Sequence, residues 1–149
     1  LEAGGRLVYA RGARALVASS WRVAPPVPPP LKKTVVEVRL VPGPDWARLC
    51  PSTTDAVKTV ESLRYKLSAK SDRMGLRLDG EALTVPPDAA LGVSRPVVPG
   101  TVQIPPDGKP IILLAEGQVV GGYPQLGQVA SIDLPKLVQA RPGAEVVFR

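Results

Sequence analysis

Histidine is absent from this 149-residue chain, and cysteine occurs only once, at Cys50. Without histidine the chain has no Ser–His triad, no Cys–His dyad and no imidazole metal ligand. A single cysteine excludes an internal disulfide and a cysteine-based zinc site. We expect Cys50 to be a small core residue, and the chain to work in a reducing, cytoplasmic compartment. Chemistry must therefore rely on carboxylates, Lys, Arg, Tyr, hydroxyls or backbone groups.

Aromatic residues and long apolar runs are also scarce. The chain has two Trp, three Tyr and one Phe, and none of them lies within a basic cluster. Of the net charge of +6, residues 1–40 carry +5 and residues 41–149 carry +1, so the main part is nearly neutral. We therefore expect neither a nucleic-acid partner nor a membrane span.

A phosphate-binding loop is missing as well, because no glycine-rich segment is followed by Lys-Ser or Lys-Thr. The chain is not expected to bind and cleave ATP by itself. It starts with Leu1 rather than Met and has no signal-peptide pattern, so we expect it to be part of a longer protein.

Proline is abundant, with 18 residues, and it marks a boundary at residues 24–30, Ala-Pro-Pro-Val-Pro-Pro-Pro. Such a run favours an extended polyproline II conformation and cannot pair in a sheet. It could serve a polyproline-reading module, but we interpret it as a stiff connector. The predicted organisation is two short strands and this connector in residues 1–34, followed by one domain in residues 35–149.

Residues 35–149 alternate between short apolar segments and turn residues. Val36, Val38 and Leu40 alternate with Glu37 and Arg39, which predicts a half-buried strand over 35–41. Further strands are predicted at 5–10, 14–19, 64–68, 74–79, 101–104, 110–115, 126–131 and 144–149. Helices are predicted near 53–62, from a capping box, and at 134–140, with Asp133 as its cap and Pro135 in its first turn. This rhythm indicates a mainly β fold, a closed or nearly closed barrel with two short helices.

The segment from Ser71 to Gly80 holds the first candidate site. Met74, Leu76 and Leu78 are expected on one face of a strand, and Arg73, Arg77 and Asp79 on the other. At the entry of this strand, Asp72 could accept hydrogen bonds from a urea-like or lactam nitrogen, and Arg73 could bind a carboxylate or phosphate. Alternatively, Asp72 caps a turn and Arg73 pairs with a surface acid.

The second candidate site is Gly121-Gly122-Tyr123-Pro124. Glycines let a ligand approach backbone amides, and the Tyr123 hydroxyl could donate a hydrogen bond. A Gly-Gly hairpin followed by a packed tyrosine would explain the same residues. Gln118 is a further candidate for an amide contact, whereas Pro105 to Pro110 is interpreted as a structural turn.

Taken in order, these segments resemble the C-terminal half of the KipA family, also called allophanate hydrolase subunit 2 or the C subunit of 5-oxoprolinase. The resemblance rests on the Ser71–Gly80 segment and on four later motifs, which are Val98-Pro99-Gly100-Thr101-Val102-Gln103, Pro106-Asp107-Gly108-Lys109-Pro110, Gly121-Gly122-Tyr123-Pro124 and Asp133-Leu134-Pro135-Lys136-Leu137. The chain departs from the family at Val119-Val120, where Thr-Thr is common. It departs again at Ala90 to Pro96, where a candidate acid is missing.

The resemblance implies a cyclophilin-like barrel, and a non-autonomous subunit of a 5-oxoprolinase or biotin-dependent carboxyltransferase-like complex acting on a small amide, lactam or urea. The alternative is a regulatory module that engages a KipI-type protein without catalysis. Implied partners are a KipI-type protein and the family's N-terminal half. ATP or carboxybiotin would be handled by partner subunits, with no cofactor or metal bound by this chain. Substrate-binding residues would be Asp72, Arg73, Gly121, Gly122 and Tyr123, and the isolated chain is expected to be inactive.

Overall fold

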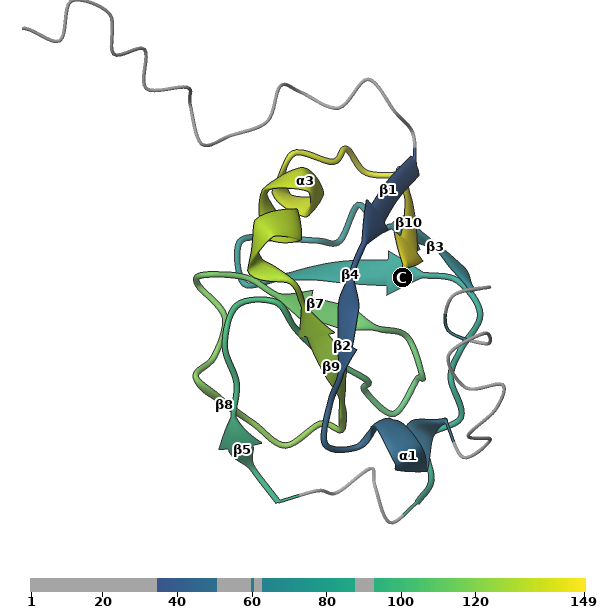
Figure 1. Cartoon of the computed structure of the whole chain (residues 1–149), viewed down its shortest axis with the longest axis vertical. Coiled ribbons are helices and arrows are strands. Elements are labelled where there is room, and N and C mark those ends of the chain that lie inside the picture. The colour runs from purple at the N-terminus through teal and green to yellow at the C-terminus, as the bar shows by residue number, and fades with distance from the viewer. Residues whose placement is uncertain (1–34, 51–59, 61–62, 88–92) are drawn as a thin grey trace, which may run out of the picture.

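The computed structural model describes residues 35–50, 60, 63–87 and 93–149. Their secondary structure is mainly β, with few helical turns (Figure 1). The strands expected at 5–10 and 14–19, the proline-rich connector, the boundary at residue 34 and most of the helix expected at 53–62 lie outside the described residues.

Eight strands of the described part form one mixed sheet in the order β1-β10-β3-β4-β7-β6-β9-β2. Of these strands only β1 and β10 are parallel, and every other neighbouring pair is antiparallel. The strands are β1 (Val35–Val38), β2 (Leu40–Pro42), β3 (Arg64–Leu67), β4 (Gly75–Asp79), β6 (Thr101–Gln103), β7 (Ile111–Leu113), β9 (Gln125–Val129) and β10 (Glu145–Phe148). Two further short strands, β5 (Arg95–Pro96) and β8 (Val120–Gly121), pair with each other in a separate ribbon. The sequence pattern did not predict these two-residue strands.

Alternating side chains explain why these segments form strands. Leu76 and Leu78 of β4 are buried and Arg77 is exposed, as expected from the sequence. The expectation for Met74 was wrong: this side chain is 50% exposed, because residue 74 lies in the turn before the strand.

The two edges of the sheet, β1 and β2, are successive parts of one extended segment, separated only by Arg39. The first part pairs with β10 and the second with β9. Two backbone hydrogen bonds lie where the segment passes from β10 to β9. They run from Leu40 N–H to the Arg149 carbonyl (2.7 Å) and from Ala130 N–H to the Arg39 carbonyl (3.0 Å). Since β1 and β2 do not pair with each other, hydrogen bonds do not close the sheet of the described strands, and the expected closed barrel is not confirmed.

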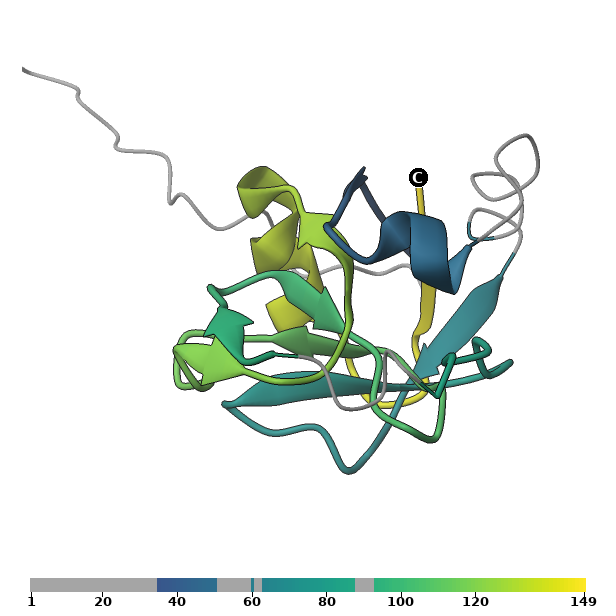
Figure 2. The same ribbon diagram turned by 90° about the horizontal axis from the view of Figure 1, so that it is seen from below.

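Three helical segments complete the described part: α1 (Trp46–Leu49), the 3₁₀ turn η1 (Ser131–Asp133) and α3 (Leu134–Val138). α3 confirms the second expected helix, with Pro135 in its first turn, while α1 was not predicted. In Figure 2 the helices α1 and α3 lie on one side of the molecule, and β4 lies on the other.

The core is formed mostly by strand side chains, and Leu49 of α1 and Leu137 of α3 join them. Tyr65 of β3 and Phe148 of β10 contact edge to face, with ring centroids 5.9 Å apart. Cys50 is buried in the same cluster, as expected, and burial raises the pKa of its thiol. A buried, protonated thiol is a packing residue rather than a nucleophile.

Candidate functional site

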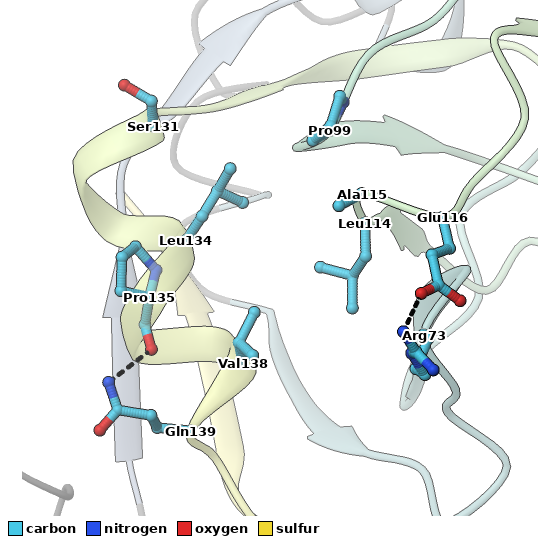
Figure 3. A pocket seen from close by; sticks show the side chains of 10 residues that line it. All are labelled: Arg73, Pro99, Leu114, Ala115, Glu116, Ser131, Leu134, Pro135, Val138 and Gln139. Atoms are coloured by element: carbon cyan, nitrogen blue, oxygen red, sulfur yellow. Dashed lines mark hydrogen bonds and ion pairs between the residues drawn. The ribbon is translucent and has the colours of Figure 1, made fainter. Parts of the chain in front are cut away.

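An apolar cavity of about 550 Å³ lies between α3 and the turn that follows β7 (Figure 3). Its helix wall is formed by Leu134, Pro135, Val138 and Gln139. Facing them are Pro99, Leu114 and Ala115. An apolar cleft with a few polar groups at its edge is the usual form of a small-molecule site.

Arg73 and Glu116 provide the charge at this cavity, where they form an ion pair (Figure 3). The Arg73 side chain is 84% exposed and that of Glu116 is 50% exposed. A bond from Leu114 N–H to the Met74 carbonyl (2.9 Å) holds their two turns side by side. Gly117 is required there, because a Cβ atom would lie 2.8 Å from the Met74 carbonyl oxygen. The surface acid that pairs with Arg73 is therefore Glu116.

Asp72 stabilises the turn before β4. Its Oδ1 atom accepts hydrogen bonds from the backbone N–H groups of Met74 (2.9 Å) and Gly75 (3.1 Å). This is an Asx turn, in which a side chain supplies the acceptor that the bent backbone lacks. Asp72 does not line the cavity, although its neighbour Arg73 does.

Gly121 lies against two amide side chains. A Cβ atom at residue 121 would be 2.5 Å from Gln103 Nε2 and 3.0 Å from Gln118 Nε2. Gln118 Nε2 donates to Gln103 Oε1 (3.2 Å), and Gln103 Nε2 donates to the Tyr123 carbonyl (3.4 Å). In this structure the groups that lie close to the backbone of Gly121 are thus the side-chain amides of Gln103 and Gln118. Gln103 is 1% exposed, and the sequence analysis named it only as the last residue of the motif that starts at Val98, not as a candidate site residue.

Gly122 and Tyr123 follow β8, and the Tyr123 side chain is 42% exposed. Gly121, Gly122 and Tyr123 are not among the residues that line the cavity beside Arg73. The structure thus brings Arg73 to the cavity without the glycine segment.

Asp133 fixes the helix wall of the cavity. Its side chain is 1% exposed and binds the Arg39 Nε atom (2.8 Å), the Arg39 backbone N–H (3.1 Å) and Lys136 Nζ (2.6 Å). These bonds, above all the one from the Arg39 side chain, hold the pKa of Asp133 well below its usual range. Asp133 occupies the expected N-cap position of α3, but its side chain makes no cap bond, because the carboxylate is engaged by Arg39 and Lys136.

A second cavity, of about 160 Å³, is polar and lies where β4 meets the turn before β7. Asp79 and Lys109 pair across it at 3.5 Å. A hydrogen bond from Ser68, together with Lys109 and Lys70, lowers the pKa of Asp79. The Pro105–Pro110 segment supplies a tight turn here, with Gly108 at a φ of 73°.

Within the described ranges, no group of three or more Cys, Asp or Glu side chains is placed to hold a metal ion. That same part contains no helix with the length and apolar character needed to cross a bilayer.

The described part is thus a mainly β domain with an apolar, charge-edged cavity beside α3. A family model for the carboxyltransferase domain, subdomains A and B, matches residues 1–149. The chain belongs to this family, and the resemblance inferred from its motifs is confirmed.

Two curated relatives are named as the C subunit of 5-oxoprolinase. The Escherichia coli protein is 34% identical over 111 residues, which cover 74% of this chain and 34% of the relative. The Haemophilus influenzae protein is 40% identical over 84 residues, covering 56% of this chain and 27% of the relative. The chain thus spans about a third of the length of these relatives, or less.

Among solved structures, the K. lactis urea amidolyase is similar with a TM-score of 0.71 at 20% identity. The match covers 83% of this chain and 8% of that protein. At this identity the likeness shows the fold alone, and it supports a carboxyltransferase-like arrangement of the strands.

Proposed function

We propose that this chain is a domain or subunit of a 5-oxoprolinase or biotin-dependent carboxyltransferase-like complex, acting on a small amide, lactam or urea. The observation that carries the proposal is the family match over the whole chain, together with two relatives named for the C subunit of 5-oxoprolinase. The partner would be a KipI-type protein, and ATP or carboxybiotin would be bound by partner subunits.

The cavity beside α3 is the proposed ligand site of this chain. Its apolar walls suit the ring or chain of a small lactam or amide, and Arg73 would anchor a carboxylate through its planar, permanently charged guanidinium. Asp72, Gly121, Gly122 and Tyr123 are proposed to contribute to substrate binding in the assembled complex. Because the glycine segment does not line the cavity, this proposal requires a partner surface that completes one binding site from both.

One observation favours the alternative, a regulatory module that binds a KipI-type protein without catalysis. The charged residues that line the cavity are Arg73 and Glu116, and they are paired with each other. The lining therefore offers an anchor but no nucleophile paired with a base.

A reconstitution assay separates the two proposals. The chain is mixed with a KipI-type protein and the remaining 5-oxoprolinase subunits, and ATP hydrolysis is measured with and without 5-oxoproline. Substrate-dependent hydrolysis supports the enzyme subunit, and tight binding without turnover of any small amide supports the regulator. The isolated chain should show no activity in the same assay, and turnover by it alone would contradict the proposal.

The Arg73→Lys variant tests the anchor within the reconstituted complex. Lysine keeps the charge but loses the bidentate fork, so ligand affinity should fall by about 1–3 kcal/mol, the scale of a charged hydrogen bond. Unchanged affinity would leave Arg73 as a surface residue paired with Glu116.

A further inference from the structure

The polar cavity of about 160 Å³ is lined by three cationic side chains from three segments of the chain. Lys70 comes from the turn after β3, Arg77 from β4 and Lys109 from the segment before β7. Asp79 and Asp107 are the acids of the same lining. This cavity is distinct from the apolar cavity beside α3, because the two share no lining residue.

Both acids of the polar cavity are engaged within the protein. Asp79 pairs with Lys109 at 3.5 Å and accepts a hydrogen bond from Ser68. Asp107 Oδ1 accepts a hydrogen bond from the backbone N–H of Lys109 (3.2 Å), as an aspartate in a tight turn commonly does. These contacts leave two of the three cations of the lining without an acid.

Those two cations are Lys70 and Arg77. Within the described ranges, neither side chain forms an ion pair with an acid, and Lys70 acts on Asp79 only through its charge. Two cations that line one cavity repel each other, whereas an anion between them would be attracted by both. The charge of the cavity therefore favours an anionic ligand.

Hydrogen bonds to β4 hold the segments around the cavity in place. Ser71 Oγ accepts from the Arg77 N–H (3.0 Å) and donates to the Arg77 carbonyl (3.3 Å). The Leu78 N–H donates to the Pro110 carbonyl (3.0 Å). The turn that carries Lys70 and the segment before β7 are thus both fastened to β4, so a ligand has only side chains to order.

We infer that this cavity binds a phosphate group, either as inorganic phosphate or as part of a phosphate monoester. A phosphate group carries close to two negative charges and three acceptor oxygens, one for each of Lys70, Arg77 and Lys109. Lys109 keeps its bond to Asp79, because an ammonium group has three donors. The cavity is smaller than the about 300–1,000 Å³ of sites that enclose a whole drug-sized ligand, so the rest of a monoester would lie in solvent.

The test titrates the 149-residue chain with inorganic phosphate and, separately, with glycerol 3-phosphate at constant ionic strength. Binding is followed by NMR shifts of the backbone amides, which report weak binding and its position. The amides of β4 and of the segment before β7 should shift. A higher affinity for glycerol 3-phosphate would identify a monoester as the ligand, and an equal or lower affinity would identify the free ion.

Arg77→Gln and Lys70→Gln should each weaken phosphate binding by at least about tenfold, because each removes a charged hydrogen bond. Asp79→Asn should strengthen it, because the acid that repels the anion is lost. The matched control is Arg141→Gln, which removes an exposed cation outside both cavities and should bind like the wild type. Urea denaturation should give Arg77→Gln and Lys70→Gln the wild-type midpoint, since both side chains are exposed.

Three results would overturn the inference. The first is absence of binding of either compound by the wild-type chain, and the second is equal affinity of Arg77→Gln and wild type. The third is loss of binding in Arg73→Gln but not in Arg77→Gln, because the anion would then lie at the apolar cavity. The test needs neither a partner subunit nor turnover, so its outcome is independent of the proposed function.

Discussion

Two kinds of ion pair occur in this domain, and they differ in burial. The carboxylates of Asp133 and Asp45 are 1% and 6% exposed, and each joins segments that lie far apart in the chain. The Arg73–Glu116 pair is exposed on both sides and lies beside the apolar cavity. Since a buried carboxylate needs its partners to offset desolvation, the first kind maintains the fold. The second kind is exposed to solvent and contributes little to stability.

The largest expected effect comes from Asp133→Asn. The amide keeps the shape but loses the charge that Arg39 and Lys136 bind, so the free energy of unfolding should fall by about 2–3 kcal/mol, less than for a fully buried pair because Arg39 is 62% exposed. Urea denaturation measures the change. The control is Glu37→Gln, which breaks an exposed pair with Arg149 and should cost less than about 0.5 kcal/mol. Equal losses in the two variants would remove the distinction between buried and exposed pairs.

Asp45→Asn should have the next largest effect, about 1.5–2 kcal/mol, the lower end of the scale for one hydrogen bond to a charged group. Asp45 Oδ2 accepts from Arg95 NH1 (2.9 Å) and from the Gln125 backbone N–H (2.9 Å), and thereby joins α1 to β5 and β9. The loss should appear in urea denaturation as a lower midpoint with an unchanged slope. A changed slope would instead indicate that the ribbon detaches before the sheet unfolds.

The pH dependence of stability should also carry the signature of Asp133. Its pKa is lowered in the folded state, so its contribution is present above its unfolded pKa of about 4 and is lost as the pH falls toward the folded value. The stability difference between wild type and Asp133→Asn should therefore be constant near neutral pH and shrink below about pH 4. Urea midpoints measured across this range test the prediction. A difference that grows on acidification would contradict the assigned sign.

Local features of this fold could be predicted from the sequence, whereas contacts between residues far apart in the chain could not. Alternation along 35–41 and 74–79 predicted strands, because burial of every second side chain is a local property of the chain. Asp72 and Arg73 were singled out together, yet one stabilises a turn and the other lines the cavity. The partners Glu116 and Arg39 could not be predicted, because Arg39 and Asp133 are 94 residues apart and meet only through the sheet. The ribbon of β5 and β8 was missed because two-residue strands leave no periodic pattern.

The smallest effect on stability, and the sharpest test of the exposed pair, comes from Glu116→Gln. Breaking this surface pair should change the free energy of unfolding by less than about 0.5 kcal/mol, because both side chains are well exposed. If Arg73 anchors an anionic ligand, Glu116 competes with that ligand for the guanidinium. Glu116→Gln should then raise the affinity of the assembled complex for a carboxylate ligand, whereas Arg73→Lys lowers it. Calorimetric titration of both variants, with urea denaturation as the control for folding, measures the two signs. Changes of the same sign would show that the pair acts as a structural unit, and the Arg73 anchor would have to be abandoned.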